Sequence, residues 1–163
     1  MISILIADTD EIFADEICNY TKHVQGIEVV EVTGNGNKAF ELIKKLMPDV
    51  VIMDLILLVE DGFRLLEKVN SNDFYYKPIF IVASYVSNEN FIRSAIELGV
   101  QYYFIKPVQM GTLFKRIRQL YYERFEIPFL TDQKTEEEKA AEMQEKEIIA
   151  DDIRPIAGKL LKE

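Results

Sequence analysis

An apolar run that ends directly in an acid constrains the fold of this chain more than any other stretch. Residues 50–53 are Val-Val-Ile-Met, Pro48 stands shortly before them, and Asp54 follows at once. Continuous apolar runs are typical of strands covered on both faces, as in the middle of a parallel sheet. Ligands of open α/β sheets bind outside the carboxyl ends of the strands. Asp54 is therefore expected at a position suited to chemistry, although an aspartate that merely opens a turn is the simpler interpretation of this residue alone.

Short apolar strands and amphipathic helices alternate along the first three quarters of the chain. The expected strands are 2–7, 27–32, 50–53, 79–83 and 100–105. The expected helices are 12–24, 39–47, 63–69, 91–96 and 113–121, from apolar residues at helical spacing. Alternation of this kind predicts a doubly wound α/β domain with a parallel five-stranded sheet and helices on both faces, because right-handed crossovers keep successive strands parallel. We expect this domain to occupy residues 1–124.

The composition changes after Pro128. The segment 136–147 is rich in Glu and Lys with little apolar periodicity, and Pro155 would kink or restart any later helix. These features predict a charged C-terminal extension over 125–163, either a solvated helix or a linker.

Composition also excludes several classes of protein. The formal net charge of −9 argues against direct nucleic-acid binding, which needs clustered Lys and Arg. No apolar run has the length of a membrane span, and the first residues lead into a strand rather than a signal peptide. The single cysteine, Cys18, has no internal disulfide partner and fits a small core residue. We expect a cytoplasmic protein.

Polar residues follow four of the expected strands. Asp8 and Asp10 come after the first strand, Asp54 after the third, Ser84 after the fourth and Lys106 after the fifth. In a parallel sheet these residues project from the same edge. Grouped carboxylates favour a hard divalent cation such as Mg²⁺. A metal, a hydroxyl and an ammonium around one carboxylate form a set suited to phosphoryl transfer onto that carboxylate.

These residues and their order resemble the receiver domain of bacterial two-component response regulators. The similarity extends from residue 2 to about residue 123. It rests on five blocks, which are Ile-Leu-Ile-Ala-Asp at 4–8, Pro-Asp-Val-Val-Ile-Met-Asp-Leu at 48–55, Asp61-Gly62, Ser84, and Leu98-Gly99 through Tyr103 to Lys106-Pro107. The family fold is flavodoxin-like, with strand order 2-1-3-4-5.

The resemblance implies a role for each residue of the set. Asp54 would be the phospho-acceptor, Asp8 would belong to the acidic Mg²⁺ pocket, and the backbone carbonyl of Ile56 would be a further metal ligand. Ser84 would contact the phosphoryl group through its hydroxyl, and Lys106 would bond to it through its ammonium.

Two further features are implied by the family. Tyr103 resembles the aromatic switch residue whose ring orientation follows phosphorylation. The Lys-Pro bond is commonly cis in the family, which would apply to Lys106-Pro107.

The chain also departs from the family pattern. Thr9 occupies the position of a second acid that normally ligates the metal, so we expect weaker Mg²⁺ binding unless Asp10 reaches the site. Tyr85 follows Ser84 where the family prefers a small residue, and a ring there would obstruct an approaching phosphodonor. A Leu pair at 57–58 replaces the usual Met-Pro and changes the stiffness of the loop.

The expected function is that of a phospho-acceptor in a phosphorelay rather than an enzyme. The phosphoryl group would come from a histidine kinase or a phosphotransfer protein. Phosphorylation would alter the surface of the fourth helix, fifth strand and fifth helix, a natural place for homodimerisation or output contacts. This surface comprises residues 91–98, 100–106 and 113–122.

Two alternatives remain open from the sequence. A degenerate receiver would have the same fold without useful phosphorylation and would act as a protein-interaction module, as Thr9 and Tyr85 suggest. A phosphatase of the haloacid-dehalogenase type would use the Asp-x-Asp at 8–10, but the chain after Lys106 lacks the further acidic cluster that such enzymes need.

Overall fold

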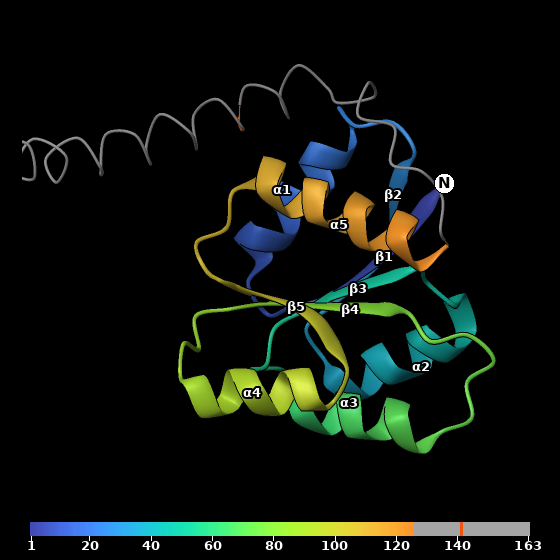
Figure 1. Cartoon of the computed structure of the whole chain (residues 1–163), viewed down its shortest axis with the longest axis vertical. Helices are drawn as coiled ribbons and strands as arrows, with labels where there is room; N and C mark the ends of the chain where they lie inside the picture. The colour runs from blue at the N-terminus through green and yellow to red at the C-terminus, as the bar shows by residue number, and fades with distance from the viewer. Residues whose placement is uncertain (126–140, 142–163) are drawn as a thin grey trace, which may run out of the picture.

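A parallel five-stranded sheet forms the centre of the computed structural model, which describes residues 1–125 and residue 141. The strand order is β2-β1-β3-β4-β5, as predicted, and the five helices alternate with the strands (Figure 1). The elements are β1 (Ile2–Ala7), α1 (Glu11–Thr21), β2 (Ile27–Thr33), α2 (Gly36–Leu46), β3 (Val50–Met53), α3 (Gly62–Ser71), β4 (Ile79–Ser84), α4 (Glu89–Glu97), β5 (Val100–Ile105) and α5 (Met110–Arg124). The predicted doubly wound α/β fold is therefore confirmed. Apart from Phe125 and Ala141, the predicted extension lies outside the described residues.

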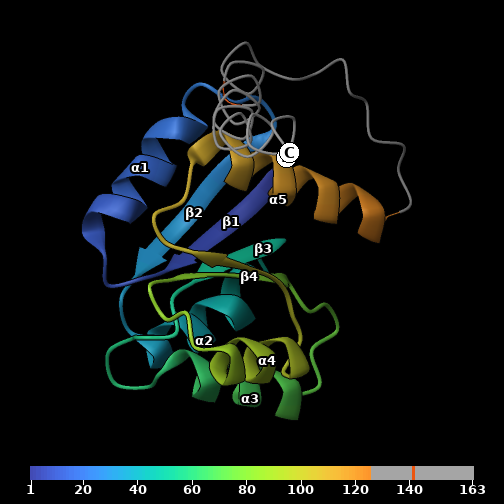
Figure 2. The same cartoon turned by 60° about the vertical axis from the view of Figure 1, so that its left-hand side comes forward.

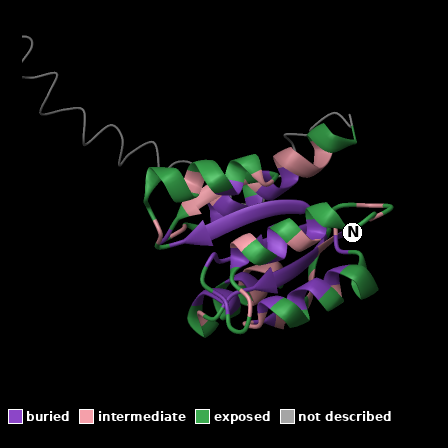
Figure 3. Cartoon of the chain, turned by 90° about the horizontal axis from the view of Figure 1, so that it is seen from below, coloured by how far each residue is buried: buried purple, intermediate pink, exposed green. Residues whose placement is uncertain are grey.

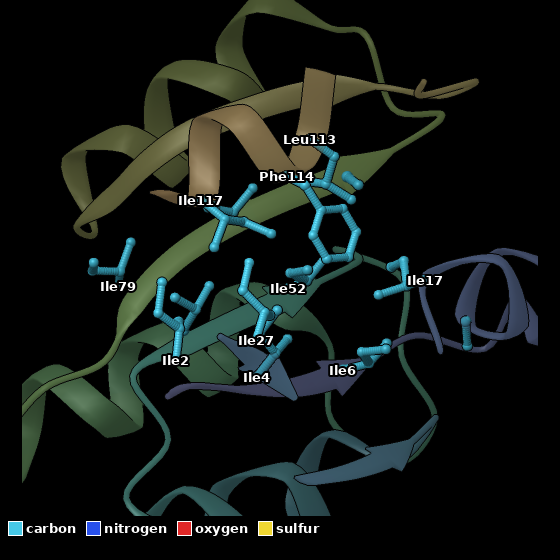
Figure 4. Close-up of a cluster of buried hydrophobic side chains, with 14 of the residues drawn as sticks. Ile2, Ile4, Ile6, Ile17, Ile27, Ile52, Ile79, Leu113, Phe114 and Ile117 are labelled. Atoms are coloured by element: carbon cyan, nitrogen blue, oxygen red, sulfur yellow. The ribbon is translucent and has the colours of Figure 1, made fainter. Parts of the chain in front are cut away.

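The helices form two layers, one on each face of the sheet. Helices α1 and α5 cover one face, and α2, α3 and α4 cover the other (Figure 2). Side chains at alternate strand positions enter the two cores, so Ile4 and Ile6 pack under α1 and α5 while Leu5 faces α2 and α3. Figure 4 shows Phe114 and Ile117 of α5 pointing toward the isoleucines of the first of these cores. Strands β3 and β4 are buried along their length and the edge strands β2 and β5 only in part, whereas the outer sides of the helices are exposed (Figure 3).

Strand β3 occupies the middle of the sheet and explains the apolar run. It pairs with β1 on one side and β4 on the other. Val50, Val51, Ile52 and Met53 are fully buried, because their side chains enter the two cores alternately. The prediction of a strand covered on both faces is thus confirmed.

Capping residues fix the helix boundaries that periodicity left open. Asp10 caps α1 by accepting a hydrogen bond from the backbone N–H of Phe13, and Asn88 caps α4 by accepting from the backbone N–H groups of Asn90 and Phe91. Helix α1 ends at Thr21, so Val24 lies beyond the helix predicted for it and is buried from the following turn. Helix α2 ends before Met47, which has a φ of 45°, because the residue before a proline is disfavoured in the helical region.

The strand register brings the polar strand ends to one edge. Ala7 of β1, Met53 of β3 and Val82 of β4 pair in one row across the sheet. The backbone N–H of Asp54 donates to the carbonyl oxygen of Ala7 at 2.9 Å, so the chain after β3 leaves the sheet beside the chain after β1. Within the described residues, no helix is both long and apolar enough to cross a membrane.

Candidate functional site

The Asp54 carboxylate lies at the carboxyl end of β3, and each of its oxygens has a partner. Asp54 is 7% exposed. Its Oδ1 accepts hydrogen bonds from the Ser84 hydroxyl at 2.6 Å and from the backbone N–H of Ile56 at 3.1 Å. Its Oδ2 accepts from the Lys106 ammonium at 3.3 Å. A hydroxyl and an ammonium therefore meet one buried carboxylate from two neighbouring strand ends.

Lys106 lies at the end of β5 with its ammonium turned inward. Its backbone N–H donates to the carbonyl oxygen of Ser84 at 2.9 Å, which holds the two strand ends together. The side chain is 2% exposed, and the peptide bond to Pro107 is cis, as the family resemblance implied. Burial alone disfavours the charged ammonium, but the hydrogen bond to Asp8 and the charges of nearby carboxylates outweigh it and raise the pKa of Lys106.

Asp8 is the closest partner of this ammonium. Its Oδ2 lies 2.9 Å from Lys106 Nζ, and its Oδ1 accepts a hydrogen bond from the backbone N–H of Asp10 at 2.8 Å. Burial raises the pKa of Asp8, and the hydrogen bonds from Lys106 and Asp10 offset this only in part. A further cation placed beside Asp8 would therefore stabilise the ionised form of its carboxylate.

The Asp10 carboxylate makes two different interactions, one with each of its oxygens. Its Oδ1 caps α1 at Phe13, and its Oδ2 lies 3.5 Å from Lys106 Nζ. The backbone N–H of Phe13 and the Lys106 charge together lower the pKa of Asp10 despite some burial. Asp10 does reach the edge of the acidic pocket, but its side chain remains about one third exposed, at 33%.

Thr9 and Tyr85, two of the departures from the family pattern, are both exposed and lie next to residues of the site. Thr9 is exposed, and its methyl carbon lies against the backbone of Gly34 in the loop before α2. Tyr85 is 66% exposed, and its ring centroid lies 5.6 Å from Lys106 Nζ. Tyr85 therefore stands beside the approach to Asp54, where sequence reasoning expected it to interfere.

Hydrogen bonds connect the pocket to Tyr103 through a residue that sequence reasoning missed. The backbone N–H of Val86 donates to Ser84 Oγ at 3.2 Å, and the Tyr103 hydroxyl donates to the carbonyl oxygen of Val86 at 2.5 Å. Val86 takes part through its backbone, so its side-chain type gave no signal. Tyr103 is half-buried, and burial is the main cause of its raised pKa.

Phe13 is a second contact that the sequence did not reveal. Its ring centroid lies 4.5 Å from Lys106 Nζ on the side of α1. The ring covers the ammonium and adds a cation–π attraction to the carboxylate contacts. Phe13 falls within the apolar pattern that predicted the helix at 12–24, and it is also a core residue, at 5% exposed.

The donor set fits a divalent cation, although with fewer acids than a dedicated metal site. In the part of the chain that the structure describes, no group of three or more His, Cys, Asp and Glu side chains is arranged to hold a metal. Asp8, Asp10 and Asp54 nevertheless share a single ammonium, so two negative charges are not balanced by it. Buried carboxylate oxygens with excess negative charge are the chemistry that Mg²⁺ prefers.

Comparison with known families agrees with the fold. The sequence profile of the family described as "Response regulator receiver domain" matches residues 4–118, which is more than half of the chain. The chain therefore belongs to the response-regulator receiver domains of two-component systems, and the resemblance noted from the sequence is confirmed. This family match argues against the haloacid-dehalogenase alternative.

Solved structures with the same fold come from several bacteria. A receiver domain of a DNA-binding response regulator (merR) from Colwellia psychrerythraea 34H is 27% identical, with a TM-score of 0.66 over 74% of this chain and 98% of that chain. A LuxR-family DNA-binding response regulator from Staphylococcus aureus is 21% identical, with a TM-score of 0.68 over 74% of this chain and 99% of that chain. A CheX-CheY-BeF3-Mg²⁺ complex from Borrelia burgdorferi matches at 19% identity, with a TM-score of 0.64 over 74% of this chain and 89% of that chain. At the lower identities the likeness supports the fold alone.

Proposed function

We propose that this receiver accepts a phosphoryl group on Asp54. The observation that carries the proposal is that the Ser84 hydroxyl and the Lys106 ammonium each contact a different oxygen of one buried carboxylate. An oxygen of Asp54 attacks phosphorus, a new O–P bond forms, and the donor's bond to phosphorus breaks with the electron pair leaving on the donor. Ser84 and Lys106 then stabilise the charge on the phosphoryl oxygens, since both already lie at hydrogen-bond distance from the nucleophile.

Mg²⁺ is the proposed cofactor of this step. Asp8, Asp54 and the backbone carbonyl of Ile56 would hold it, with Asp10 or Thr9 as additional oxygen donors. When bound, it supplies positive charge near the transferring oxygens. The excess of carboxylates over the Lys106 charge supports this assignment, and the neutral, exposed Thr9 makes binding weaker than two adjacent acids would allow.

The phosphoryl donor is a histidine kinase or a phosphotransfer protein. The receiver itself is a phospho-acceptor that does no more than catalyse its own phosphorylation and dephosphorylation. The complex from Borrelia burgdorferi, in which a CheY chain is found with CheX, supports the idea that this fold works with protein partners.

The proposed output is a change in the surface of α4, β5 and α5. The hydrogen bonds from Ser84 through the Val86 backbone to Tyr103 offer a route by which Ser84, once drawn to a phosphoryl group, repositions the Tyr103 ring. Phe91 and Ile96 of α4 and Ile105 of β5 are about half exposed, at 50%, 54% and 51%. Exposed apolar side chains of this kind support homodimerisation or output contacts on this surface.

A degenerate receiver is the second candidate function. The Tyr85 ring beside the approach to Asp54 and the missing acid at Thr9 favour it. In that case the fold acts as an interaction module whose surface does not respond to phosphate.

One experiment separates the two candidates. The full chain is incubated with Mg²⁺ and a small phosphodonor, and intact-mass spectrometry is followed by peptide mapping of the added group. We expect one phosphoryl group on Asp54, and a fluoride-beryllium complex that competes with it. Absence of both the adduct and the complex would establish the degenerate receiver instead.

A further inference from the structure

Gly111 forms a notch on the face made by α1 and α5. It is the second residue of α5 and is buried. It is not among the described glycines with positive φ, which are Gly26 and Gly99, so the helix backbone does not require glycine at this position. Glycine in fact disfavours a helix relative to alanine. The reason for a glycine here therefore lies in what packs against it.

Ala141, from the chain beyond α5, packs into this notch. A β-carbon placed on Gly111 would lie 2.5 Å from the Cβ of Ala141, which is too close for two carbon atoms. The other near neighbour, the hydroxyl oxygen of Tyr20 on α1, would lie at 3.7 Å, an ordinary contact. Ala141 is itself half-buried. Among the described residues, Ala141 is thus what excludes a side chain at position 111.

The length of the chain allows this contact within one molecule. Helix α5 has 15 residues, so its two ends are about 22 Å apart. Sixteen residue steps separate Phe125 from Ala141 and reach roughly 53 Å when fully extended. The chain can therefore return from the end of α5 to its first turn with length to spare.

The charges of the two partners are complementary. Helix α5 carries Lys115, Arg116, Arg118 and Arg124 against one acid, Glu123. Of the four basic residues, Arg118 is buried and donates to the carbonyl oxygen of Gln25. Residues 131–152 contain nine acidic and three basic side chains. Lys115 lies four positions after Gly111 on the same side of α5, and the Glu run at 136–138 lies three to five positions before Ala141. A return antiparallel to α5 would bring these opposite charges together.

We propose that the segment around Ala141 docks on the α1–α5 face of its own molecule, with the Ala141 methyl group seated against Gly111. This face lies on the opposite side of the sheet from α4 (Figure 2). The chain would therefore compete with any partner for α1 and the adjoining side of α5. The inference does not depend on phosphorylation of Asp54, and its failure would leave the proposed function unchanged.

A direct test is nuclear magnetic resonance on the full chain. We expect a nuclear Overhauser cross-peak between the Ala141 methyl protons and the Gly111 α-protons. In a mixture of differently isotope-labelled chains, this cross-peak should arise only within one molecule. A missing cross-peak, or one seen only between molecules, would overturn the proposal, the latter in favour of a second copy as the occupant.

A size exchange provides the second test. Gly111→Ala should crowd the notch and increase the rate of trypsin cleavage after Lys139 and Lys146 by about five-fold, because cleavage follows the undocked population. In the double variant, Ala141→Gly removes the methyl group that meets the new β-carbon, so the cleavage rate should return to that of the natural chain.

The control is Thr112→Ala at the neighbouring, half-buried position, which should leave the cleavage rate unchanged. Alanine favours the helix at position 111, so unfolding is not the expected cause of faster cleavage, and a thermal melt of each variant checks this. Equal cleavage rates in all four chains, or no rescue by Ala141→Gly, would refute the docking.

Discussion

Strand β3 has an aspartate near each end, and the two carboxylates have different surroundings. Asp49 precedes the strand, where its Oδ2 accepts from the backbone N–H and hydroxyl of Ser3 at 2.8 and 3.0 Å, and its Oδ1 accepts from the Tyr76 hydroxyl at 3.3 Å. Asp54 follows the strand and meets the Lys106 ammonium as well as neutral donors. Within the described residues, Asp49 has no ion pair within 4.0 Å.

The difference separates a structural carboxylate from a reactive one. The neutral donors around Asp49 tie β1 and the segment before β4 to the start of β3, and among the described residues no cation pairs with it. At Asp54 a second carboxylate, Asp8, shares the same buried ammonium, so negative charge is in excess. A metal ion or a phosphoryl group would change this balance of charge. An acid at a strand end is therefore not sufficient for chemistry, and the shared buried cation makes the distinction.

The largest expected effect is on phosphorylation. Asp54→Asn should abolish phosphate addition from a small donor, because the amide is not a nucleophile. Asp49→Asn should retain phosphate addition and instead lose about 1–2 kcal/mol of stability, because its hydrogen bonds weaken. Intact-mass spectrometry and urea unfolding measure the two quantities. Phosphate addition that persists in Asp54→Asn would remove the chemical distinction between the two ends of β3.

Loss of the shared cation should have the next largest effect. Lys106→Met is expected to lower the free energy of unfolding by about 3 kcal/mol, because it leaves the Asp8 and Asp54 carboxylates buried without a cation. The control is Lys68→Met, since the pair of Lys68 and Glu60 is partly exposed, at 26% and 24%, and should contribute about 1 kcal/mol or less. Urea unfolding curves compare them. Equal losses in both variants would show that burial of the cation is unimportant.

An added acid should strengthen metal binding at the Asp54 end alone. Thr9→Asp is expected to raise Mg²⁺ affinity by about ten-fold, because affinity for hard cations follows the number of charged ligands. The control is Thr9→Asn, because asparagine has nearly the same shape as aspartate but carries no charge. Isothermal titration calorimetry gives the dissociation constants, and a Thr9→Asp affinity no better than that of Thr9→Asn would place the metal elsewhere.

Access to Asp54 should improve when the ring beside it is removed. Tyr85→Ala is expected to increase the rate of phosphorylation by a small donor about three-fold, an effect of under 1 kcal/mol on the barrier. The fold should be unaffected because Tyr85 is 66% exposed. Tyr75→Ala, at a fully exposed ring, should not change the rate. A slower reaction in Tyr85→Ala would mean that the ring assists rather than obstructs.

The smallest effect concerns Asp10, whose lowered pKa predicts a pH dependence. A carboxyl group with a lowered folded-state pKa stabilises the fold above its ordinary value of 3.8, and that stability is lost as the pH falls through the lowered value. Asp10→Asn keeps a capping side chain without the charge. It should be less stable than the natural chain by at most about 0.5 kcal/mol at neutral pH, given the partial exposure of the group.

The gap between the two proteins should close in acid. Thermal unfolding between pH 7 and pH 3 measures it, with buffer and salt concentration kept constant. If the difference in stability between the natural chain and Asp10→Asn widened as the pH fell, the Phe13 N–H and the Lys106 ammonium would not be stabilising the ionised Asp10 carboxylate.

Much of the fold was predictable because local patterns and packing agree. The run at 50–53 predicted a strand with both faces covered, and β3 pairs on both sides and is fully buried. Helix boundaries were less predictable, since caps rather than periodicity decide them. Val24 shows this, because its apolar spacing continued the pattern of α1 although the helix ends at Thr21.

The candidate site was predictable in its residue types but not in its contacts. Asp8, Asp54, Ser84 and Lys106 stood out because each follows a strand, and the structure brings them together. Their functional roles remain predictions. Phe13 and Val86 gave no signal, because one looks like any core residue and the other acts through its backbone.

The sequence by itself determined which side chains leave the sheet at one edge, because parallel strands that alternate with helices all end on the same side. Only the tertiary structure decided which carboxylates share the Lys106 ammonium and which of the two aspartates beside β3 stays with neutral partners. The physical reason is that strand ends are set by local hydrophobic pattern. The distances between charged groups depend instead on the paths of several loops and on side-chain conformations that packing selects.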